Sequence, residues 1–491
     1  MRTCLQFSSR IESFDGRGFF SDLVSFNPIR PPFLMLATMP FYLLGSYNED
    51  FAIMVNILFL ALCFFIIFAI SRIYFQRKIA LLSCFILFCY PLVFGLCRQY
   101  LVDISLMFSV LLSIYLLLKC ARFSNFKYSL LLGLSLGIGM LTKITYAAFI
   151  IGPLFFTIWQ AEKEKSEILK PKLNLLVCLI ISLLLTSFWY LPNLKVMVSL
   201  ITDCGFGKEA LRSSVGGIWS LSSFSFYPEF MANYGMSVFF AALFLLSLFI
   251  LLRKENLSKI MFFLLWIIVP LVFFTFCLSK DIRFLVPVLP ATALLTAQGI
   301  YEIRHRQFRR ILIILIIFIG CFQFFVDSLE VPFFSKTPPR RLSWKNIVFF
   351  EVIDAGCYLQ HPKKEEWKMK EFFQALKDDC QRNSLYEGGV ITLSNHKAYN
   401  ANTLDYYARK NKIGLRFMGE ISAWEAIKSN DFQYVVFKDK FATDLADCQK
   451  IIDSVYAYIN SNSQSFKMIY KAQVFDGSDI YIYRYLGKIK G

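Results

Sequence analysis

The sequence lacks several features from which catalytic and ligand sites are commonly built. No two cysteines are spaced as Cys-x-x-Cys, and the three histidines, His305, His361 and His396, lie far apart in the chain. The sequence therefore indicates no cluster of metal ligands. A divalent metal is possible but is not supported by such a cluster, and no cofactor is predicted with certainty. A glycine-rich phosphate loop and a nucleophile elbow are also missing from the C-terminal third.

Apolar residues, by contrast, are abundant. The chain has 491 residues, of which 56% are hydrophobic, and its mean hydropathy is +0.53. A soluble domain does not need so much apolar surface, whereas a polytopic α-helical membrane protein does. The net charge of +17 could suit nucleic acid, but much of the basic excess lies in short loops between apolar runs. That distribution is typical of cytoplasmic loops, so no nucleic-acid partner is predicted.

The apolar runs predict about ten membrane crossings. Runs of about 20 residues span one bilayer, and runs twice as long between two basic loops must cross an even number of times. The runs are Phe51–Ile70, Ile79–Leu118, Tyr128–Trp159, Leu173–Leu191, Ser237–Leu252, Leu257–Ile300 and Ile311–Phe325. Pro31–Leu44 is too short to cross and is predicted to be an interfacial helix.

Loop charges predict the orientation. The loops on one side hold 17 Lys and Arg, and the three hairpin tips on the other side hold four. The basic side is therefore predicted to be cytoplasmic. The segment before Phe51, the loop Lys195–Gly235 and the chain after Val326 are then extracytoplasmic. The composition, without an Asn-x-Ser/Thr sequon in these outer segments, favours a bacterial inner membrane.

The predicted domains are a first outer loop with its interfacial helix (1–50), a transmembrane domain (51–330) and an extracytoplasmic α/β domain (336–491). In the α/β domain, short apolar runs of strand length alternate with helical patterns. The predicted strands are Val390–Leu393, Gly414–Met418, Tyr434–Lys438, Met468–Val474 and Ile480–Tyr485; the predicted helices are Glu365–Asp379, Ala401–Lys410, Ser422–Ser429 and Asp444–Ile459. Cys357, Cys380 and Cys448 permit one disulfide and a spare thiol, or none.

Three charged tips interrupt the apolar runs and are predicted to form one polar site. A charge at membrane depth costs about 2.5–3.5 kcal/mol on insertion scales, so it is rare unless it faces a wet cavity or a partner. The charged residues are Arg98 and Asp103, Lys143, and Lys280 and Arg283. The alternatives are that Asp103 only neutralises Arg98, that Lys143 reaches to the interface without a ligand, and that Lys280 and Arg283 are anchors.

These tips also carry a resemblance. Arg30-Pro31-Pro32-Phe33-Leu34, the turn Arg98…Asp103, Gly137-Ile138-Gly139-Met140-Leu141-Thr142-Lys143, and Lys280-Asp281-Ile282-Arg283-Phe284-Leu285-Val286-Pro287 with Pro290 follow one another in the chain. Together they resemble motifs of the polyprenyl-phosphate-sugar-dependent membrane glycosyltransferases of the GT-C fold, which include protein mannosyltransferases, aminoarabinose transferases and Rgt-like enzymes. The resemblance covers about residues 20–330.

The sequence departs from the family pattern at its start. The family opens with a transmembrane helix followed by an acidic catalytic motif, often Asp-Glu, in the first outer loop. This chain begins within that loop, and no Asp-Glu pair precedes Arg30. Either Met1 is a truncated start, which we expect, or the base has been lost. Asp15 and Asp22 are the candidate catalytic bases, and Glu12 is a third carboxylate.

The resemblance implies an inverting transferase that moves a hexose or pentose from a polyprenyl phosphate to an extracytoplasmic lipid, glycan or protein. Lys143, Lys280 and Arg283 would bind the donor phosphate, because cations stabilise the charge that develops on it. Arg98, Asp103 and Arg30 would support the site. The alternatives are a catalytically inactive relative acting as an assembly subunit and a transporter of a lipid-linked solute. A transporter should show repeats or helices broken near mid-bilayer, and none is evident.

Overall fold

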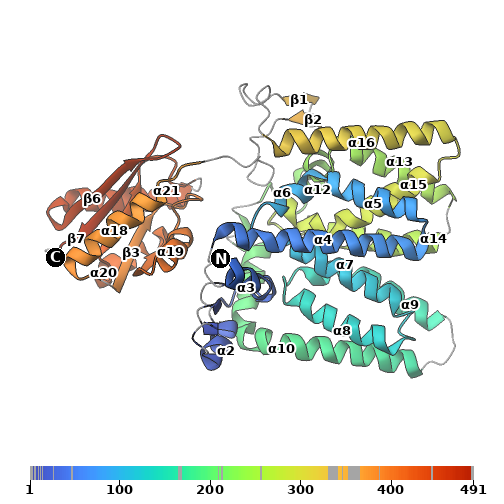
Figure 1. Cartoon of the computed structure of the whole chain (residues 1–491), viewed down its shortest axis with the longest axis horizontal. Coiled ribbons are helices and arrows are strands. Elements are labelled where there is room, and N and C mark those ends of the chain that lie inside the picture. Colours follow the sequence, from blue (N-terminus) through green and yellow to red (C-terminus); the bar gives the residue numbers. More distant parts are fainter. Residues whose placement is uncertain are drawn as a thin grey trace. The chain divides into compact units, whose positions relative to one another are not determined.

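The structure is a computed structural model of the whole chain, shown in Figure 1. It describes residues 4, 7, 8, 10, 11, 13, 15–25, 27–45, 48–163, 169–207, 210–211, 214–254, 257–329, 341–344, 347–351, 365–385, 387–443 and 446–487. The chain forms two compact units, one of residues 10–362 and one that contains residues 363–491 together with the first nine. The domain boundaries predicted from the sequence stay predictions.

The first unit is helical, and its helices follow the apolar runs. They are α2 (Gly16–Ser25), α3 (Phe33–Gly45), α4 (Glu49–Tyr74), α5 (Arg77–Cys89), α6 (Pro91–Cys97), α7 (Asp103–Lys119), α8 (Phe126–Met140), α9 (Tyr146–Lys163), α10 (Leu169–Phe206), α12 (Leu221–Phe230), η1 (Met231–Gly235), α13 (Val238–Lys254), α14 (Leu257–Thr275), η2 (Ile282–Val288), α15 (Leu289–Tyr301) and α16 (Arg306–Ser328). The strands β1 (Arg341–Trp344) and β2 (Ile347–Glu351) add an antiparallel hairpin.

Among the described residues, four helices are long and apolar enough to cross a membrane. They are α4, α10, α16 and the continuous η2–α15 segment; the count rises to six if the bent pairs α5–α6 and α12/η1–α13 are each one span. The prediction of ten crossings stays a prediction, since several helices of the hairpins are shorter than this criterion requires.

Two helices of this unit, α7 and α15, are largely buried. Residues 289–300 of α15 are all buried. Hydroxyl groups join α7 to its neighbours: Ser109 lies 3.1 Å from the Thr142 hydroxyl and Ser113 lies 2.6 Å from the Ser135 hydroxyl. Small polar residues let helix backbones approach closely and satisfy one another inside an apolar medium. This packing holds the α8–α9 turn against the start of α7.

The helix α3 lies at one end of the helical unit, where Figure 1 shows it crossing the direction of α4. The backbone N–H of Phe33 donates to the Leu141 carbonyl at 3.1 Å, and the Thr38 hydroxyl lies 2.9 Å from that of Tyr100. The helix therefore contacts two of the three tips. Its predicted position along the membrane surface stays a prediction.

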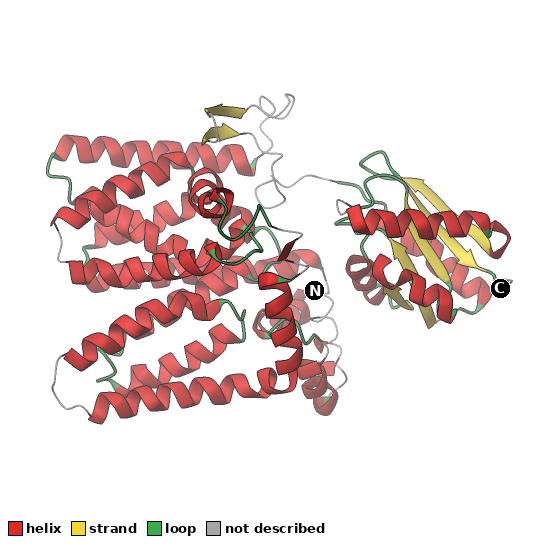
Figure 2. Ribbon diagram, turned by 180° about the vertical axis from the view of Figure 1, so that it is seen from behind, coloured by secondary structure: helices red, strands yellow, loops and turns green. Residues whose placement is uncertain are grey.

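The second unit is an α/β sandwich, seen with its strands in yellow in Figure 2. Its sheet has the order β4-β3-β5-β7-β6, with β3 parallel to β4 and β5, and β7 antiparallel to β5 and β6. The strands are β3 (Glu387–Leu393), β4 (Gly414–Met418), β5 (Tyr434–Lys438), β6 (Phe466–Gln473) and β7 (Asp479–Tyr485). These agree with the predicted strands to within a few residues.

Two apolar cores cover the two faces of this sheet. The helices α18 (Met369–Asn383) and α19 (Ala401–Lys410) pack on one face, and α20 (Ala423–Ser429) and α21 (Ala446–Ser461) pack on the other. Successive strand residues alternate between these cores because strand side chains point to opposite faces. Cys380 and Cys448 are buried free thiols, so a disulfide between these two is excluded. Cys357 lies outside the described residues.

Candidate functional site: an ionic cluster at three helix tips

The structure brings three sequence-predicted residues together. The Asp103 carboxylate lies 3.3 Å from the Lys143 ammonium through Oδ1 and 3.8 Å from Arg283 Nη1 through Oδ2. Asp103 is only 1% exposed, whereas the two cationic side chains are each about a quarter exposed. A buried carboxylate thus contacts two cations whose side chains are partly exposed at the protein surface.

Each member is placed by a helix end. Asp103 is the first residue of α7, where a negative charge is favoured by the helix dipole. Lys143 lies just beyond the end of α8, and its backbone N–H donates to the Gly139 carbonyl of that helix at 3.3 Å. Arg283 stands at the start of η2, and its backbone N–H donates to the Asp281 carboxylate, which caps that helix.

Two further contacts fix the orientation of the cations. Arg283 donates from Nε to both Asp281 oxygens, at 3.1 and 2.9 Å, and its Nη2 lies 2.5 Å from Oδ2. Such a forked pairing is stronger and more directional than a single charge contact. The Lys143 ammonium lies 5.1 Å from the centre of the Phe284 ring, within the range of a cation–π interaction.

Lys280 is placed differently from the other predicted phosphate ligands. Its buried ammonium donates to the carbonyls of Phe274 and Thr275, at 3.0 and 2.5 Å. Both carbonyls belong to the last turn of α14, where backbone acceptors have no partner within the helix. In the structure Lys280 therefore caps α14, and no hydrogen bond or ion pair among the described residues joins it to the Asp103 cluster.

Arg98 does not pair with Asp103, so the alternative that Asp103 only neutralises Arg98 is wrong. Its Nη1 donates to the Asp327 carbonyl at 3.2 Å, and its guanidinium lies 5.5 Å from the centre of the Phe94 ring. The two side chains point in different directions. Asp103, in the first turn of α7, points toward the other two tips, whereas Arg98, at the end of α6, points toward the end of α16. Arg98 supports the tip rather than the cluster.

The predicted bases lie in the N-terminal segment and share one partner. Arg10 contacts the Asp15 carboxylate through Nη1 at 2.6 Å and that of Asp22 through Nε at 2.8 Å. The contact with Asp22, followed by that with Asp15, raises the pKa of the Arg10 guanidinium. Asp15 also caps α2, since its Oδ1 accepts the backbone N–H of Gly18. Their catalytic role stays a prediction.

Arg30 and Glu12 are the other predicted residues of that segment. Arg30 is exposed, and its backbone N–H donates to the Asn27 carbonyl at 3.4 Å. The segment is anchored by Asn193 of α10, whose amide donates to the Val24 carbonyl at 2.8 Å. Glu12 lies outside the described residues.

Sequence reasoning missed three residues that shape the tips: Asp281, Asp327 and Asn56. The signal for Asp281 was available, because an Asp two residues before an Arg at a helix start can cap the helix and pair with that Arg. Asn56 donates to the Leu101 carbonyl at 3.2 Å and so holds the first tip from within α4. A single Asn inside an apolar run was its signal. Within the described ranges, no three Cys, His, Asp or Glu side chains are grouped as metal ligands.

Residues 29–190 match the family described as dolichyl-phosphate-mannose-protein mannosyltransferase. The structure is similar to that of ArnT from Cupriavidus metallidurans bound to undecaprenyl phosphate, with a TM-score of 0.58, 14% identity, and coverage of 98% of this chain and 92% of ArnT. The chain has the GT-C fold. The resemblance to the GT-C glycosyltransferases is thereby confirmed, and the matched residues 29–190 contain three of the four motifs on which it was based.

A second similar structure is the archaeal oligosaccharyltransferase AglB from Archaeoglobus fulgidus, in complex with an inhibitory peptide and a dolichol-phosphate. Its TM-score is 0.56 at 12% identity, and the match covers 98% of this chain and 69% of AglB. No curated protein matches the chain significantly by sequence. At such low identity the structural likeness establishes the fold, and the activity is argued from the site.

Proposed function

We propose that this protein is an integral membrane glycosyltransferase that moves a sugar from a polyprenyl phosphate to an extracytoplasmic lipid, glycan or protein acceptor. The observation that carries the proposal is the Asp103–Lys143–Arg283 cluster, in which two partly exposed cations are held side by side at the tips of three helical segments. The family match over residues 29–190 and the lipid phosphates bound by the two similar proteins support the same ligand chemistry.

The chemistry follows from what two cations can do for a phosphodiester. In an inverting transfer the acceptor atom attacks the anomeric carbon on the side opposite the phosphate, while the bond from that carbon to the phosphate oxygen breaks. The electron pair stays on the leaving phosphate, and the proton of the acceptor passes to a carboxylate base. Lys143 and Arg283 stabilise the negative charge that grows on the leaving group.

The roles of Asp103, Lys143 and Arg283 are assigned from the exposure of their side chains and from the groups that they contact. Asp103 is too buried to meet an acceptor, so it positions the two cations. Lys143 and Arg283 each have an exposed portion that can contact a phosphate oxygen. We assign the phosphate contacts to these two residues first, and Lys280 would join them only if it left the carbonyls that it caps. Asp15 and Asp22 remain the proposed bases.

The proposal is tested by binding and by turnover. Undecaprenyl phosphate is titrated into the full chain in nanodiscs, and native mass spectrometry measures its occupancy. Lys143→Met and Arg283→Lys should each weaken binding about tenfold, because hydrogen bonds to charged groups contribute about 1.5–3 kcal/mol. Lys127→Met is the matched control, since Lys127 is exposed near the opposite end of α8.

Turnover is measured as release of polyprenyl phosphate from labelled polyprenyl-phosphate glucose, mannose and aminoarabinose in the presence of cell-envelope extract. Lys143→Met and Arg283→Lys should lower this release, and the control Lys127→Met should leave it unchanged. Wild-type binding and release in both Lys143→Met and Arg283→Lys would show that these residues are only interfacial anchors.

A further inference from the structure

We propose that the C-terminal unit carries a saccharide-binding site in the cavity between α20, α21 and the end of β7. This cavity is an open hollow at the surface with a volume of about 370 Å³, and it is lined by Trp424, Ile427, Lys428, Asn430, Tyr458, Tyr485 and Gly487. This volume lies at the lower end of the range of about 300–1,000 Å³ typical of small-ligand pockets. The proposal goes beyond the transferase activity, because it concerns binding and needs no donor lipid.

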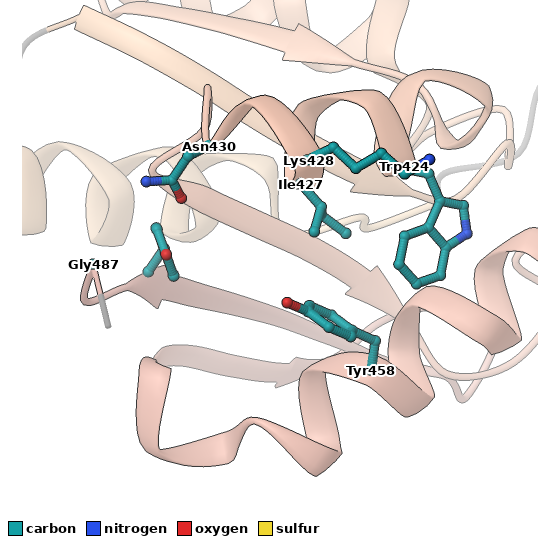
Figure 3. Close-up of a pocket in the computed structure, with 7 residues that line it drawn as sticks. Trp424, Ile427, Lys428, Asn430, Tyr458 and Gly487 are labelled. Atoms are coloured by element: carbon teal, nitrogen blue, oxygen red, sulfur yellow. The ribbon is translucent and has the colours of Figure 1, made fainter. Parts of the chain in front are cut away.

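The lining comes from one face of a helix. Trp424, Ile427 and Lys428 are spaced by three and four residues on α20, so they project to the same side. Figure 3 shows the Trp424 and Tyr458 side chains at one end of the pocket and Asn430 above Gly487 at the other. The aromatic and amide groups therefore stand at opposite ends of one hollow.

The aromatic end suits the apolar face of a sugar ring. The Trp424 and Tyr458 rings meet edge to face with their centres 5.6 Å apart, and the indole N–H donates to the Ser454 hydroxyl at 3.3 Å. With its one polar atom engaged, the indole offers a ring surface in a fixed orientation. Tyr485 packs against Phe432 with ring centres 4.7 Å apart, which makes the neighbouring wall rigid.

Three polar groups of the lining can bind hydroxyl or carboxylate oxygens. In the described part of the chain, the Tyr458 hydroxyl, the Lys428 ammonium and the Asn430 side-chain amide make no hydrogen bond or ion pair with protein. An apolar ring surface with a small number of polar groups is the usual composition of a small-ligand site. Because one of these groups is a cation, the ligand class that fits is a pyranose, preferentially one that carries a carboxylate.

Asn430 allows a test that preserves the fold. It ends α20 in the left-handed conformation, with φ of 56°, which glycine adopts without strain. Asn430→Gly should therefore remove the amide and keep the backbone. Ser384→Gly is the matched control, because Ser384 ends α18 with φ of 54° and does not line the cavity.

The measurement is saturation-transfer difference NMR on the purified full chain with six free sugars: glucose, galactose, mannose, N-acetylglucosamine, glucuronic acid and galacturonic acid. We expect transfer to the ring C–H protons, strongest for the uronic acids. Trp424→Ala should remove it, Asn430→Gly should weaken binding about fivefold and Lys428→Met should abolish the preference for the acids. Ser384→Gly should leave transfer unchanged.

The proposal fails if none of the six sugars receives saturation, or if Trp424→Ala and Asn430→Gly leave transfer at the level of wild type. Equal loss in Ser384→Gly would also overturn it, because the effect would then come from the backbone rather than from the amide. None of these outcomes bears on the Asp103 cluster, whose test uses undecaprenyl phosphate. The two proposals can therefore fail separately.

Discussion

Replacing Asp103 by Asn tests how the ionic cluster works. Together with Asp281, which pairs with Arg283, the Asp103–Lys143–Arg283 cluster contains two carboxylates and two cations, so the formal charge of the four side chains is zero. Asp103→Asn preserves the size of the side chain but leaves the cluster with a charge of +1. Two consequences follow, one for stability and one for the binding of a lipid phosphate.

The stability of the protein should fall. Removing one partner of a buried ion pair costs about 3–5 kcal/mol when the remaining charge stays buried. Here Lys143 and Arg283 are each about a quarter exposed, and Arg283 keeps Asp281. Water and Asp281 therefore compensate in part, and we expect a loss of about 2 kcal/mol, below that range. The fall is measured as a lower thermal midpoint in detergent.

The affinity for undecaprenyl phosphate should rise. Removing a negative charge about 5 Å from a bound phosphate, at an effective dielectric constant of about 40–80, favours the anion by about 0.8–1.7 kcal/mol. This energy corresponds to a dissociation constant lower by a factor of about 4 to about 17. Turnover should nevertheless drop, because the two cations lose their common anchor and the product phosphate leaves more slowly.

Asp281→Asn is the matched control. It raises the charge of the cluster by the same amount and keeps an oxygen that can accept the Arg283 backbone N–H, but it leaves Asp103 in contact with both cations. We expect tighter binding in both variants and a larger loss of turnover in Asp103→Asn. If Asp103→Asn binds undecaprenyl phosphate as the wild type does and unfolds at the same temperature, the cluster is not the phosphate site.

Three further outcomes are expected. A periplasm-active reporter fused after Gly491 should give signal, and activity of a cytoplasmic reporter at that position would contradict the predicted orientation. Asp15→Asn should abolish transfer while undecaprenyl phosphate still binds; if only Asp22→Asn does so, Asp22 is the base. Burial, and then Lys438, lowers the pKa of His396 below 6.5, so the unfolded chain takes up the proton first. Stability of the C-terminal unit should therefore fall as the pH drops below about 6.5, and this dependence should weaken in His396→Gln, as followed by hydrogen exchange at several pH values.

The helices and strands could be predicted because their signals are local. Long apolar runs bordered at one end by basic residues became α4, α10 and α16, and alternating short runs became the strands of the second unit. The interruption at Lys143 likewise marked the turn between α8 and α9. In each case hydrophobic spacing and a nearby charge or turn residue suffice, and distant parts of the chain are not needed.

The partners of the charged residues could not be predicted, because they depend on which tips meet. Asp103 is five residues from Arg98, yet it pairs with Lys143, 40 residues away, and with Arg283. Sequence proximity favoured Arg98, while the direction of the first turn of α7 decided otherwise. Lys280 shows the same limit: its spacing to Arg283 suggests a shared ligand, but the open carbonyls of α14 compete for its ammonium.

The cluster also explains why charges from three separate hairpin tips occur together. One cation or one carboxylate at this depth would carry an insertion penalty of about 2.5–3.5 kcal/mol. Joined in one cluster, two carboxylates and two cations compensate one another, so the tips stabilise one another as they pack. A phosphate that approaches the exposed portions of Lys143 and Arg283 then adds a negative charge to a neutral group. Binding can therefore remain moderate, which a transferase needs in order to release polyprenyl phosphate after each transfer.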